Sequence, residues 1–341
     1  MTSFLNDYDE LCHPKILENL AKFNGIKYKG YSDDEHVKLA IKYLKRDLKN
    51  DNVDIHFVHG GTIVNVLGII LSLRRFEGVL SCDTGHIVNT ENGSIESTGH
   101  QIIQVPNKDG KVTVEELKKA MDCHSKEYCV SIKLVYISNA TELGTVYTRN
   151  EIEELSTFCK SNGLYLFMDG ARIGTALSSS NSDLKMEDLT KYFDIFSIGG
   201  TKNGMLMGEA LVIVNNDLKL EARKIIKQKG ALLAKGYFFG IQFWTMFEDG
   251  LYYRLANHAV EMAKKLAAVF EKHKVFLEHS QESNLVFVKM PKELADKLLK
   301  EVSFEIVHDF CKEMCLTRFA TTWNTREEDI CNLEKVLNRY Q

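Results

Sequence analysis

The chain has little proline and tryptophan, and it lacks the features that mark specialised protein classes. Among its 341 residues there are three prolines and two tryptophans. It shows no internal repeat, low-complexity tract or long block of like charge, which argues against repeat, fibrous and disordered proteins. The composition, 44% hydrophobic and 26% charged, is that of a globular protein. A chain of this length is expected to form one large domain and a smaller one.

Neither sign of charge is in large excess. The formal net charge is −4, and Lys and Glu are interleaved along the chain, so we expect neither nucleic acid nor a membrane surface as a partner. The first residues lack a basic stretch followed by an apolar one, and no apolar run approaches the length that spans a bilayer. These absences predict a cytoplasmic protein.

The eight cysteines are scattered, and several lie within apolar runs. This distribution is typical of reduced core thiols rather than of a disulfide framework. His308, Cys311 and Cys315 have a spacing that would place them on one face of a helix, as metal ligands can be. However, they lead into an apparent strand and a fourth ligand is not evident, so we expect no metal site.

Helical and strand-like segments alternate over the first two thirds of the chain. Apolar residues recur at three- and four-residue spacing over 37–48, the stripe of an amphipathic helix, and further helices are expected at 62–75, 114–121 and 150–161. Strands are expected at 53–58, 78–82, 100–105, 131–137, 164–169 and 194–198. This alternation predicts an α/β fold with a doubly wound, mostly parallel sheet.

The pattern changes after about residue 235. A long helical region over 237–272 is followed by short strands near 285–289 and 316–320, with helices around them, which indicates a smaller α+β domain. We therefore expect an N-terminal segment at 1–14 that packs near the functional site, a large domain at 15–235 and a small C-terminal domain at 236–341. The three prolines fall where elements begin or end.

Ligands of a doubly wound sheet lie beyond the carboxyl ends of its strands, so reactive side chains at strand exits are the candidates for a site. The strand at 53–58 leads into Gly60, Gly61 and Thr62 and then directly into a helix. Glycines let the backbone approach an anion, and a helix N-terminus favours a phosphate group. A Gly-Gly turn between strand and helix is nevertheless common, so this turn alone does not identify a phosphate site.

Two further strand exits carry charged side chains. Asp169 closes the apolar strand at 164–169, where a carboxylate needs a cation or a protonated ring nitrogen; an ion pair with Arg172 or a helix cap would also satisfy it. Lys202 lies in the glycine-rich loop at 199–204, where desolvation would favour the amine that forms a Schiff base, although most loop lysines are merely solvated. Lysine, acid and phosphate loop together meet the needs of pyridoxal 5′-phosphate (PLP).

Three segments carry a family resemblance: SNATELGTVY at 138–147, MDGAR at 168–172 and GGTKNG at 199–204. They resemble the low-specificity branch of the L-threonine aldolase family, in the beta-eliminating lyase group of fold type I PLP-dependent enzymes. The similarity extends from Phe4 to about Asp329. It implies the PLP-dependent transferase-like fold, PLP as the cofactor, and a homodimer or homotetramer whose active sites are shared between subunits.

The resemblance also implies roles for individual residues. Lys202 holds PLP as a Schiff base, Asp169 pairs with the pyridinium nitrogen, and His86 stacks on the ring and assists proton transfer, which makes these three the catalytic candidates. Arg172 lies near cofactor and substrate, and Arg318 grips the substrate carboxylate with two parallel donors. Four residues are implied to bind the cofactor phosphate: Gly60, Gly61, Thr62 and Asn65. Glu91 is implied to have a supporting polar role, and Asn6 and Tyr31 to bind substrate.

Two positions depart from the family pattern. Gly60 stands where relatives often have Ser or Asn, and Tyr237 stands where they usually have an arginine that reaches the phosphate across the dimer, although Lys235 is retained. Tyr31 lies in a segment that only loosely follows the family's tyrosine-bearing segment, which reaches the neighbouring subunit's site. Of these, Gly60 and Tyr237 imply a weaker hold on the phosphate end of the cofactor.

The function expected from the resemblance is retro-aldol cleavage of a β-hydroxy-α-amino acid, such as threonine or allo-threonine, to glycine and an aldehyde. Lys202 and Asp169 would equally serve β-elimination, racemisation or transamination. A non-catalytic binding protein of the same fold is a further alternative, raised by Gly60 and Tyr237. A nucleotide-binding Rossmann protein is disfavoured, because its glycine fingerprint is missing at the first strand exit.

Overall fold

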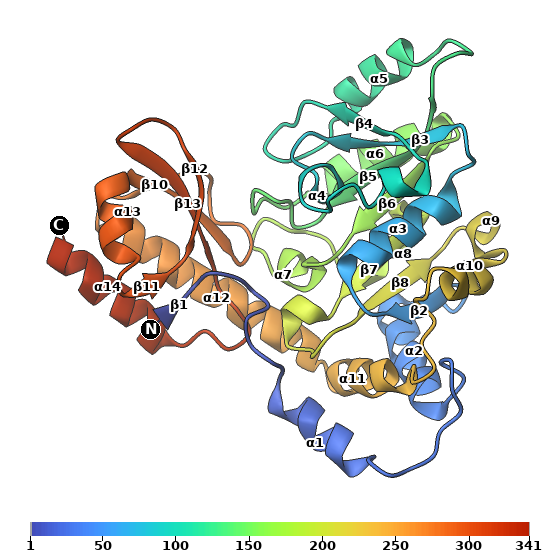
Figure 1. The fold of residues 1–341 in the computed structure, drawn as a ribbon, viewed down its shortest axis with the longest axis horizontal. Coiled ribbons are helices and arrows are strands. Elements are labelled where there is room, and N and C mark those ends of the chain that lie inside the picture. Colours follow the sequence, from blue (N-terminus) through green and yellow to red (C-terminus); the bar gives the residue numbers. More distant parts are fainter. Residues whose placement is uncertain (1, 341) are drawn as a thin grey trace.

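The computed structural model describes residues 2–340 as two units of unequal size (Figure 1). Within these residues the large unit is built on a seven-stranded sheet in the order β2-β8-β7-β6-β5-β3-β4. The pairs from β7 to β4 are parallel, and β8 is antiparallel to both of its neighbours. The predicted α/β class with a mostly parallel sheet is confirmed. The strands are β2 (Asp54–Val58), β3 (Glu77–Cys82), β4 (Ile102–Val105), β5 (Ser131–Ser138), β6 (Tyr165–Asp169), β7 (Ile195–Gly199) and β8 (Glu209–Ile213).

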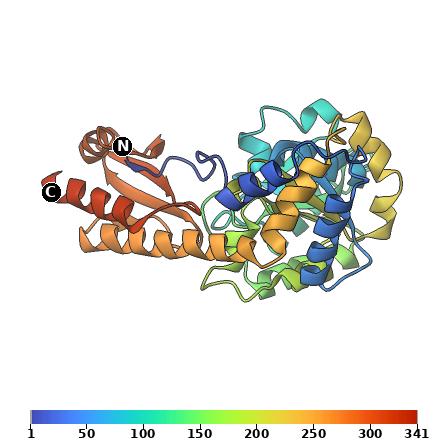
Figure 2. The same cartoon turned by 90° about the horizontal axis from the view of Figure 1, so that it is seen from below.

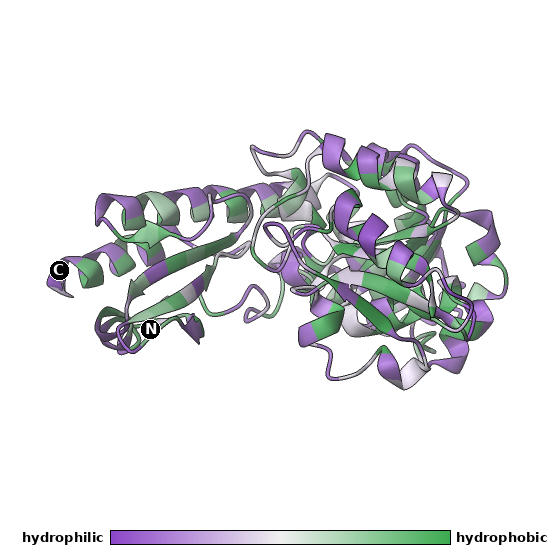
Figure 3. Ribbon diagram, turned by 90° about the horizontal axis from the view of Figure 1, so that it is seen from above, coloured by the Kyte–Doolittle hydropathy of each residue, from purple (hydrophilic) through white to green (hydrophobic). Residues whose placement is uncertain are grey.

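Both faces of this sheet are buried. Neighbouring residues of one strand belong to different core clusters, as Val79 and Leu80 of β3 do, because side chains alternate between the faces of a strand. The cluster around Leu80 packs against α2 (Glu35–Leu48), α5 (Val114–Cys123), α6 (Arg149–Ser161) and α11 (Tyr237–Phe247). The cluster around Val79 packs against α3 (Gly61–Ser72) and α10 (Ala222–Gln228). Figure 3 shows hydrophobic strands inside and hydrophilic helix faces outside.

Local signals set several helix boundaries. The side chain of Asp34 accepts hydrogen bonds from two backbone N–H groups at the start of α2, and Thr148 with Glu151 forms a capping box that begins α6. Pro14 begins α1 (Pro14–Lys22). Shorter helices join the strands: α4 (His86–Asn89), η1 (Glu96–Thr98), α7 (Ile173–Leu177), η2 (Met186–Asp188), α8 (Leu189–Tyr192), η3 (Thr201–Asn203) and α9 (Asn216–Lys219).

The small unit is built on an antiparallel sheet in the order β12-β13-β10-β9. Its strands are β9 (Phe276–Leu277), β10 (Leu285–Pro291), β12 (Glu305–Asp309) and β13 (Met314–Ala320), and its helices are α12 (Leu251–Lys272), α13 (Lys292–Leu298) and α14 (Glu327–Tyr340). The helical region expected over 237–272 divides into α11 and α12, because Gly250 takes a left-handed conformation with φ +73°. Helix α12 runs from one unit into the other (Figure 2).

The N-terminal segment connects the two units. Strand β1 (Thr2–Ser3) pairs in parallel with β11 (Val302–Ser303), and Phe4 is fully buried in the small unit's core. Residues 4–13, called here the N-terminal strap, then cross to the large unit, where α1 begins (Figure 2). The expected domain boundaries at residues 14 and 235 stay predictions. Over the described part of the chain, no helix has the length and apolar character needed to cross a membrane.

Candidate active site

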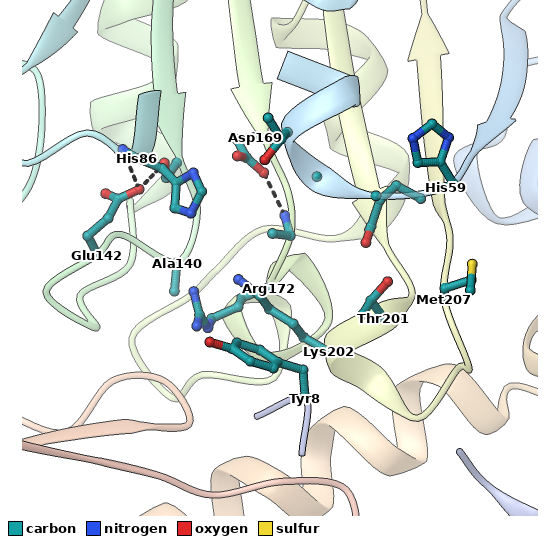
Figure 4. A pocket seen from close by; sticks show the side chains of 16 residues that line it. Tyr8, His59, His86, Ala140, Glu142, Asp169, Arg172, Thr201, Lys202 and Met207 are labelled. Atoms are coloured by element: carbon teal, nitrogen blue, oxygen red, sulfur yellow. Dashed lines mark hydrogen bonds between the residues drawn. The ribbon is translucent and has the colours of Figure 1, made fainter. Parts of the chain in front are cut away.

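A cavity of about 280 Å³ lies at the carboxyl ends of β2, β6 and β7 (Figure 4). The three strand exits singled out in the sequence therefore meet, because parallel strands present their carboxyl ends at the same sheet edge. The predicted site residues that line this cavity are Gly60, Gly61, Thr62, His86, Asp169, Arg172 and Lys202.

The start of α3 forms one end of the cavity. Gly60 is the N-cap residue and supplies no side-chain hydrogen bond, so the first backbone N–H groups of this 12-residue helix are not capped by a side chain. A Cβ added at Gly60 or at Gly61 would meet no atom within 4 Å. The space beside these glycines is thus open toward the cavity, and a phosphate group fits there in both room and charge.

Asn65 does not lie at the expected phosphate end of the cavity. It is fully buried inside α3, and its Nδ2 donates to Asp169 Oδ2 at 2.9 Å and to Glu91 Oε1 at 2.6 Å. Asn65 is absent from the residues that line the described cavity. One amide thus separates two carboxylates that would otherwise repel each other.

Asp169, the last residue of β6, is held as an ionised carboxylate. Its Oδ2 accepts hydrogen bonds from the Tyr136 hydroxyl at 2.8 Å and from Asn65, and its Oδ1 accepts the Ala171 N–H at 2.9 Å. Burial acts to raise the pKa of Asp169, but the charge of His86 and these hydrogen bonds hold it below its usual value. An anion in a dry site is suited to pair with a protonated ring nitrogen.

Lys202 lies in η3, in the loop between β7 and β8. Burial lowers the pKa of its amine, and the nearby charge of Arg172 lowers it further, which favours the nucleophilic form. Gly200 N–H donates to the Gly208 carbonyl at 3.1 Å and to Glu209 Oε2 at 3.0 Å. These bonds close the loop, so the lysine is carried by a fixed support.

His86 is oriented by two carboxylates. Its ring Nδ1 lies 2.8 Å from Glu91 Oε1, and its backbone N–H donates to Glu142 Oε1 at 3.0 Å. Burial alone would lower the pKa of His86, but the hydrogen bond to Glu91 and the charge of Asp169 raise it. The ring nitrogen that remains, Nε2, is available for proton transfer.

Arg172 pairs with a residue that sequence reasoning missed. Its Nε donates to Asp7 Oδ2 at 2.6 Å and its Nη2 to Asp7 Oδ1 at 3.2 Å. The alternative of an ion pair between Asp169 and Arg172 is wrong, since Asp7 takes that place. Asp7 lies 165 residues away in the chain and had no local signal of its own.

The remaining substrate-binding candidates lie outside the described cavity lining. Arg318 on β13 forms an ion pair with Glu305 at 2.5 Å, and its Nη2 donates to Asn6 Oδ1 at 3.3 Å. Tyr31 is 45% exposed, and the Tyr237 ring packs against Tyr28 at 5.1 Å. A single chain therefore does not bring Asn6, Tyr31 or Arg318 to the cavity wall.

The cavity also includes residues that the sequence did not single out as candidates: Tyr8, Met207 and Glu209, together with Glu142 from the quoted 138–147 segment. Tyr8 belongs to the strap, and the Lys202 amine lies 5.9 Å from its ring centroid. Burial raises the pKa of Glu209 to about 7. Of these four residues, Glu142 is the one that lay in a segment resembling the family.

The residues weighed as metal ligands lie in a hairpin. His308 is on β12, Cys311 follows that strand, and Cys315 on β13 is buried with its Sγ 3.7 Å from the Met290 carbonyl. Among residues 2–340 no group of three His, Cys, Asp or Glu side chains has a geometry that could hold a metal ion.

Comparison with known proteins gives consistent matches. Residues 23–293 match the beta-eliminating lyase family. The chain is 29% identical to the low specificity L-threonine aldolase of Pseudomonas aeruginosa, over 97% of this chain and 95% of that protein. The structure superimposes on the threonine aldolase of Leishmania major with a TM-score of 0.98 and 40% identity, over 100% of this chain and 99% of that one.

A more distant match concerns the fold alone. The histidinol-phosphate aminotransferase of Clostridium acetobutylicum gives a TM-score of 0.76 at 16% identity, over 100% of this chain and 99% of that one. The predicted fold type I class is thereby confirmed. Because proteins with different chemistries share this architecture, the fold by itself does not choose the reaction.

Proposed function

The chain belongs to the beta-eliminating lyase family, and from this membership we propose that it cleaves β-hydroxy-α-amino acids, with threonine and allo-threonine as substrates, to glycine and an aldehyde. It is a PLP-dependent lyase of fold type I. The observation that carries the proposal is the convergence of Lys202, Asp169 and the start of α3 on one cavity. PLP, when bound, supplies an electron sink for the bond that breaks at the substrate Cα.

The cavity suits this cofactor at each of its functional ends. Lys202 offers a desolvated amine for covalent attachment, and Asp169 offers a fixed negative charge for the ring nitrogen. The uncapped N-terminus of α3 offers backbone donors for the phosphate group. We assign the phosphate end to Gly60, Gly61 and Thr62, and we assign Asn65 to the support of Asp169.

The substrate end depends on two arginines and one histidine. We assign the α-carboxylate of the substrate to Arg172 and Arg318, with Asn6 beside Arg318, because a guanidinium offers paired donors to a carboxylate. His86 takes the proton of the β-hydroxyl group through Nε2, while Glu91 holds Nδ1. Removing that proton drives cleavage of the Cα–Cβ bond.

We further propose that the protein is a homo-oligomer, a dimer or a tetramer, in which Tyr31 reaches a neighbouring active site. Large apolar side chains are exposed in the strap, in the segment between α1 and α2, and at the cavity: Leu11 is 65%, Ile26 53%, Tyr31 45% and Met207 44% exposed. Such side chains gain from burial against another subunit. Light scattering during gel filtration measures the mass, and an active monomer would contradict this part of the proposal.

We also propose a cytoplasmic location. The cysteines of the described chain are all unpaired, and several are buried, which suits a reducing compartment. Microscopy of the fluorescently tagged protein tests this assignment.

The activity is tested with purified, PLP-loaded protein and L-threonine or L-allo-threonine. Release of glycine and acetaldehyde in equal amounts supports the proposal, and loss of the visible cofactor band in Lys202→Ala identifies the attachment residue. Release of ammonia with a keto acid, or change of configuration without cleavage, would instead indicate elimination, transamination or racemisation. A protein that takes up no PLP would be a non-catalytic binding protein.

A further inference from the structure

The N-terminal strap carries a buried carboxylate that faces the arginine of the cavity. The side chain of Asp7 is 1% exposed and that of Arg172 is 12% exposed, so their ion pair is shielded from water. The contact is bidentate, with Nε donating to Oδ2 at 2.6 Å and Nη2 donating to Oδ1 at 3.2 Å. Such a fork fixes the plane of the guanidinium as well as its place.

Asp7 is itself held from the small unit. Asn284 Nδ2 donates to Asp7 Oδ2 at 3.0 Å, and Asn284 Oδ1 accepts the hydroxyl of Thr175 in α7 at 3.0 Å. Upstream, Phe4 N–H donates to the Ser303 carbonyl at 2.7 Å. The carboxylate of Asp7 is therefore held by hydrogen bonds from both units.

The orientation of the Arg172 guanidinium leaves some of its N–H donors free for a ligand. Asp7 occupies Nε and one N–H of Nη2, so the other N–H groups of Arg172, including those of Nη1, remain for a group in the cavity that Arg172 lines. In Figure 4 the Arg172 guanidinium lies in the cavity near Lys202 and Tyr8. A substrate carboxylate bound there would lie close to the amine-bearing residue.

We propose that Asp7 is a positioning residue, which turns Arg172 so that its free donors meet the α-carboxylate of the amino acid. This inference rests on the proposed function, because it takes the ligand of Arg172 to be an amino-acid carboxylate. The strap and the small unit thereby set the substrate-binding geometry of the large unit. The opposite role, a carboxylate that competes with substrate for Arg172, predicts the reverse effect on binding.

The test compares two ligands of the PLP-loaded enzyme in wild type and Asp7→Asn. Glycine carries an amine and a carboxylate, whereas glycinamide carries the amine alone. Binding of each is followed by the visible absorption of the bound cofactor. In Asp7→Asn we expect the Kd of glycine to rise by roughly 10- to 100-fold, as expected for losing an oriented charge-assisted contact, with the Kd of glycinamide within about twofold of wild type.

A matched control is Asp188→Asn. Asp188 is 3% exposed and pairs with Arg149, whose side chain is 31% exposed, at 2.7 Å. This variant therefore also removes a buried aspartate from an ion pair with an arginine, but outside the residues that line the cavity. We expect it to lower thermal stability and to leave both Kd values unchanged. A purely structural role of Asp7 would make the two variants alike.

Several results would overturn the inference. Equal weakening of glycine and glycinamide by Asp7→Asn would indicate general damage, and unchanged or tighter glycine binding would indicate no role or competition. If Asp7→Asn does not fold, Asp7→Glu keeps the charge but displaces it, and Arg172→Lys removes the fork. We expect each of these variants to raise the Kd of glycine more than that of glycinamide. If neither variant shows this difference, the inference is overturned. A wild-type enzyme that prefers glycine yet cleaves no threonine would refute the proposed function alone.

Discussion

The two ends of the candidate active site are built differently. At the cofactor end, Asp169 and His86 come from one unit and are linked through Asn65 and Glu91 by hydrogen bonds that are buried or partly buried. At the substrate end, Arg172 and Arg318 come from different units, and each already pairs with a carboxylate of the protein. The cofactor end is thus preorganised within one sheet, whereas the substrate end depends on how the two units and the strap meet.

The two arginines show this difference most clearly. Arg172 is nearly buried and bound in a fork by Asp7, whereas the side chain of Arg318 is 21% exposed and that of its partner Glu305 is 42% exposed. Arg318 Nε is buried without a hydrogen-bond partner among the described residues. An unpaired buried donor is costly. A ligand could therefore satisfy Nε of Arg318, whereas Nε of Arg172 is already paired with Asp7 and only its other N–H groups remain for a ligand.

The largest expected effect is at the cofactor end. In Asp169→Asn the fixed negative charge is lost, and we expect kcat to fall by roughly 10²- to 10⁴-fold, because the charge that stabilises the protonated ring nitrogen is gone. Steady-state kinetics at saturating PLP measures this fall, and a PLP titration of the apoprotein separates it from weaker cofactor binding. A kcat within about threefold of wild type would contradict the assigned role of Asp169.

A second prediction concerns Glu209, which is 5% exposed at the cofactor end. Burial raises its pKa to about 7 from an ordinary 4.5, so the folded apoprotein holds this proton more tightly than the unfolded chain. The sign follows: the stabilisation is complete below pH 4.5 and is lost as pH rises through 7, by up to about 3 kcal/mol. Urea unfolding at pH 5 and pH 8 should show this loss in wild type and a smaller one in Glu209→Gln. An equal pH dependence in both proteins would contradict the prediction.

Much of the cofactor end could be predicted from the sequence. Strand exits are local features, and parallel strands bring their carboxyl ends together, so Asp169, Lys202 and the glycines at the start of α3 could be placed from the sequence. The partners of these residues could not be placed in the same way. The family resemblance grouped Asn65 with the phosphate loop, but in the structure its amide, on α3, donates to Asp169 instead. Successive side chains of a helix point in different directions, and a linear sequence motif does not contain this information.

The substrate end could be predicted only in part, for a related reason. Arg172 and Arg318 were named from the family resemblance. Their partners had no sequence pattern of their own: Asp7 is distant from Arg172 in the sequence, and Glu305 lies on the strand adjacent to Arg318. The pairing of Arg318 with Glu305 depends on the register between β12 and β13. Such contacts arise from tertiary packing and need the folded chain.

A third prediction separates the two arginines. Losing paired donors to a carboxylate costs about 1.5–3 kcal/mol, so Arg172→Lys should raise the KM of threonine by roughly 30-fold, and Arg318→Lys by roughly 10-fold because its site is more exposed. We expect the Arg318 effect to shrink with added salt and the Arg172 effect to persist. Kinetics at low and high ionic strength provides the measurement. Equal effects with equal salt dependence would remove the distinction between the two sites.

The smallest expected effect tests how far the cofactor end is preorganised. The hydroxyl of Tyr136, a side chain 1% exposed, donates to Asp169 Oδ2 at 2.8 Å, and Asn65 donates to the same oxygen. In Tyr136→Phe one donor is lost with little change of shape, at a cost of about 1 kcal/mol, or roughly fivefold in kcat/KM. Since the lost bond favours the carboxylate form, the pKa of Asp169 should rise, and the cofactor's absorption should become more pH-dependent. If Tyr136→Phe matched Asp169→Asn in severity, the network would act as one indivisible unit, whereas no change at all would show that the remaining donors, Asn65 and the Ala171 N–H, suffice.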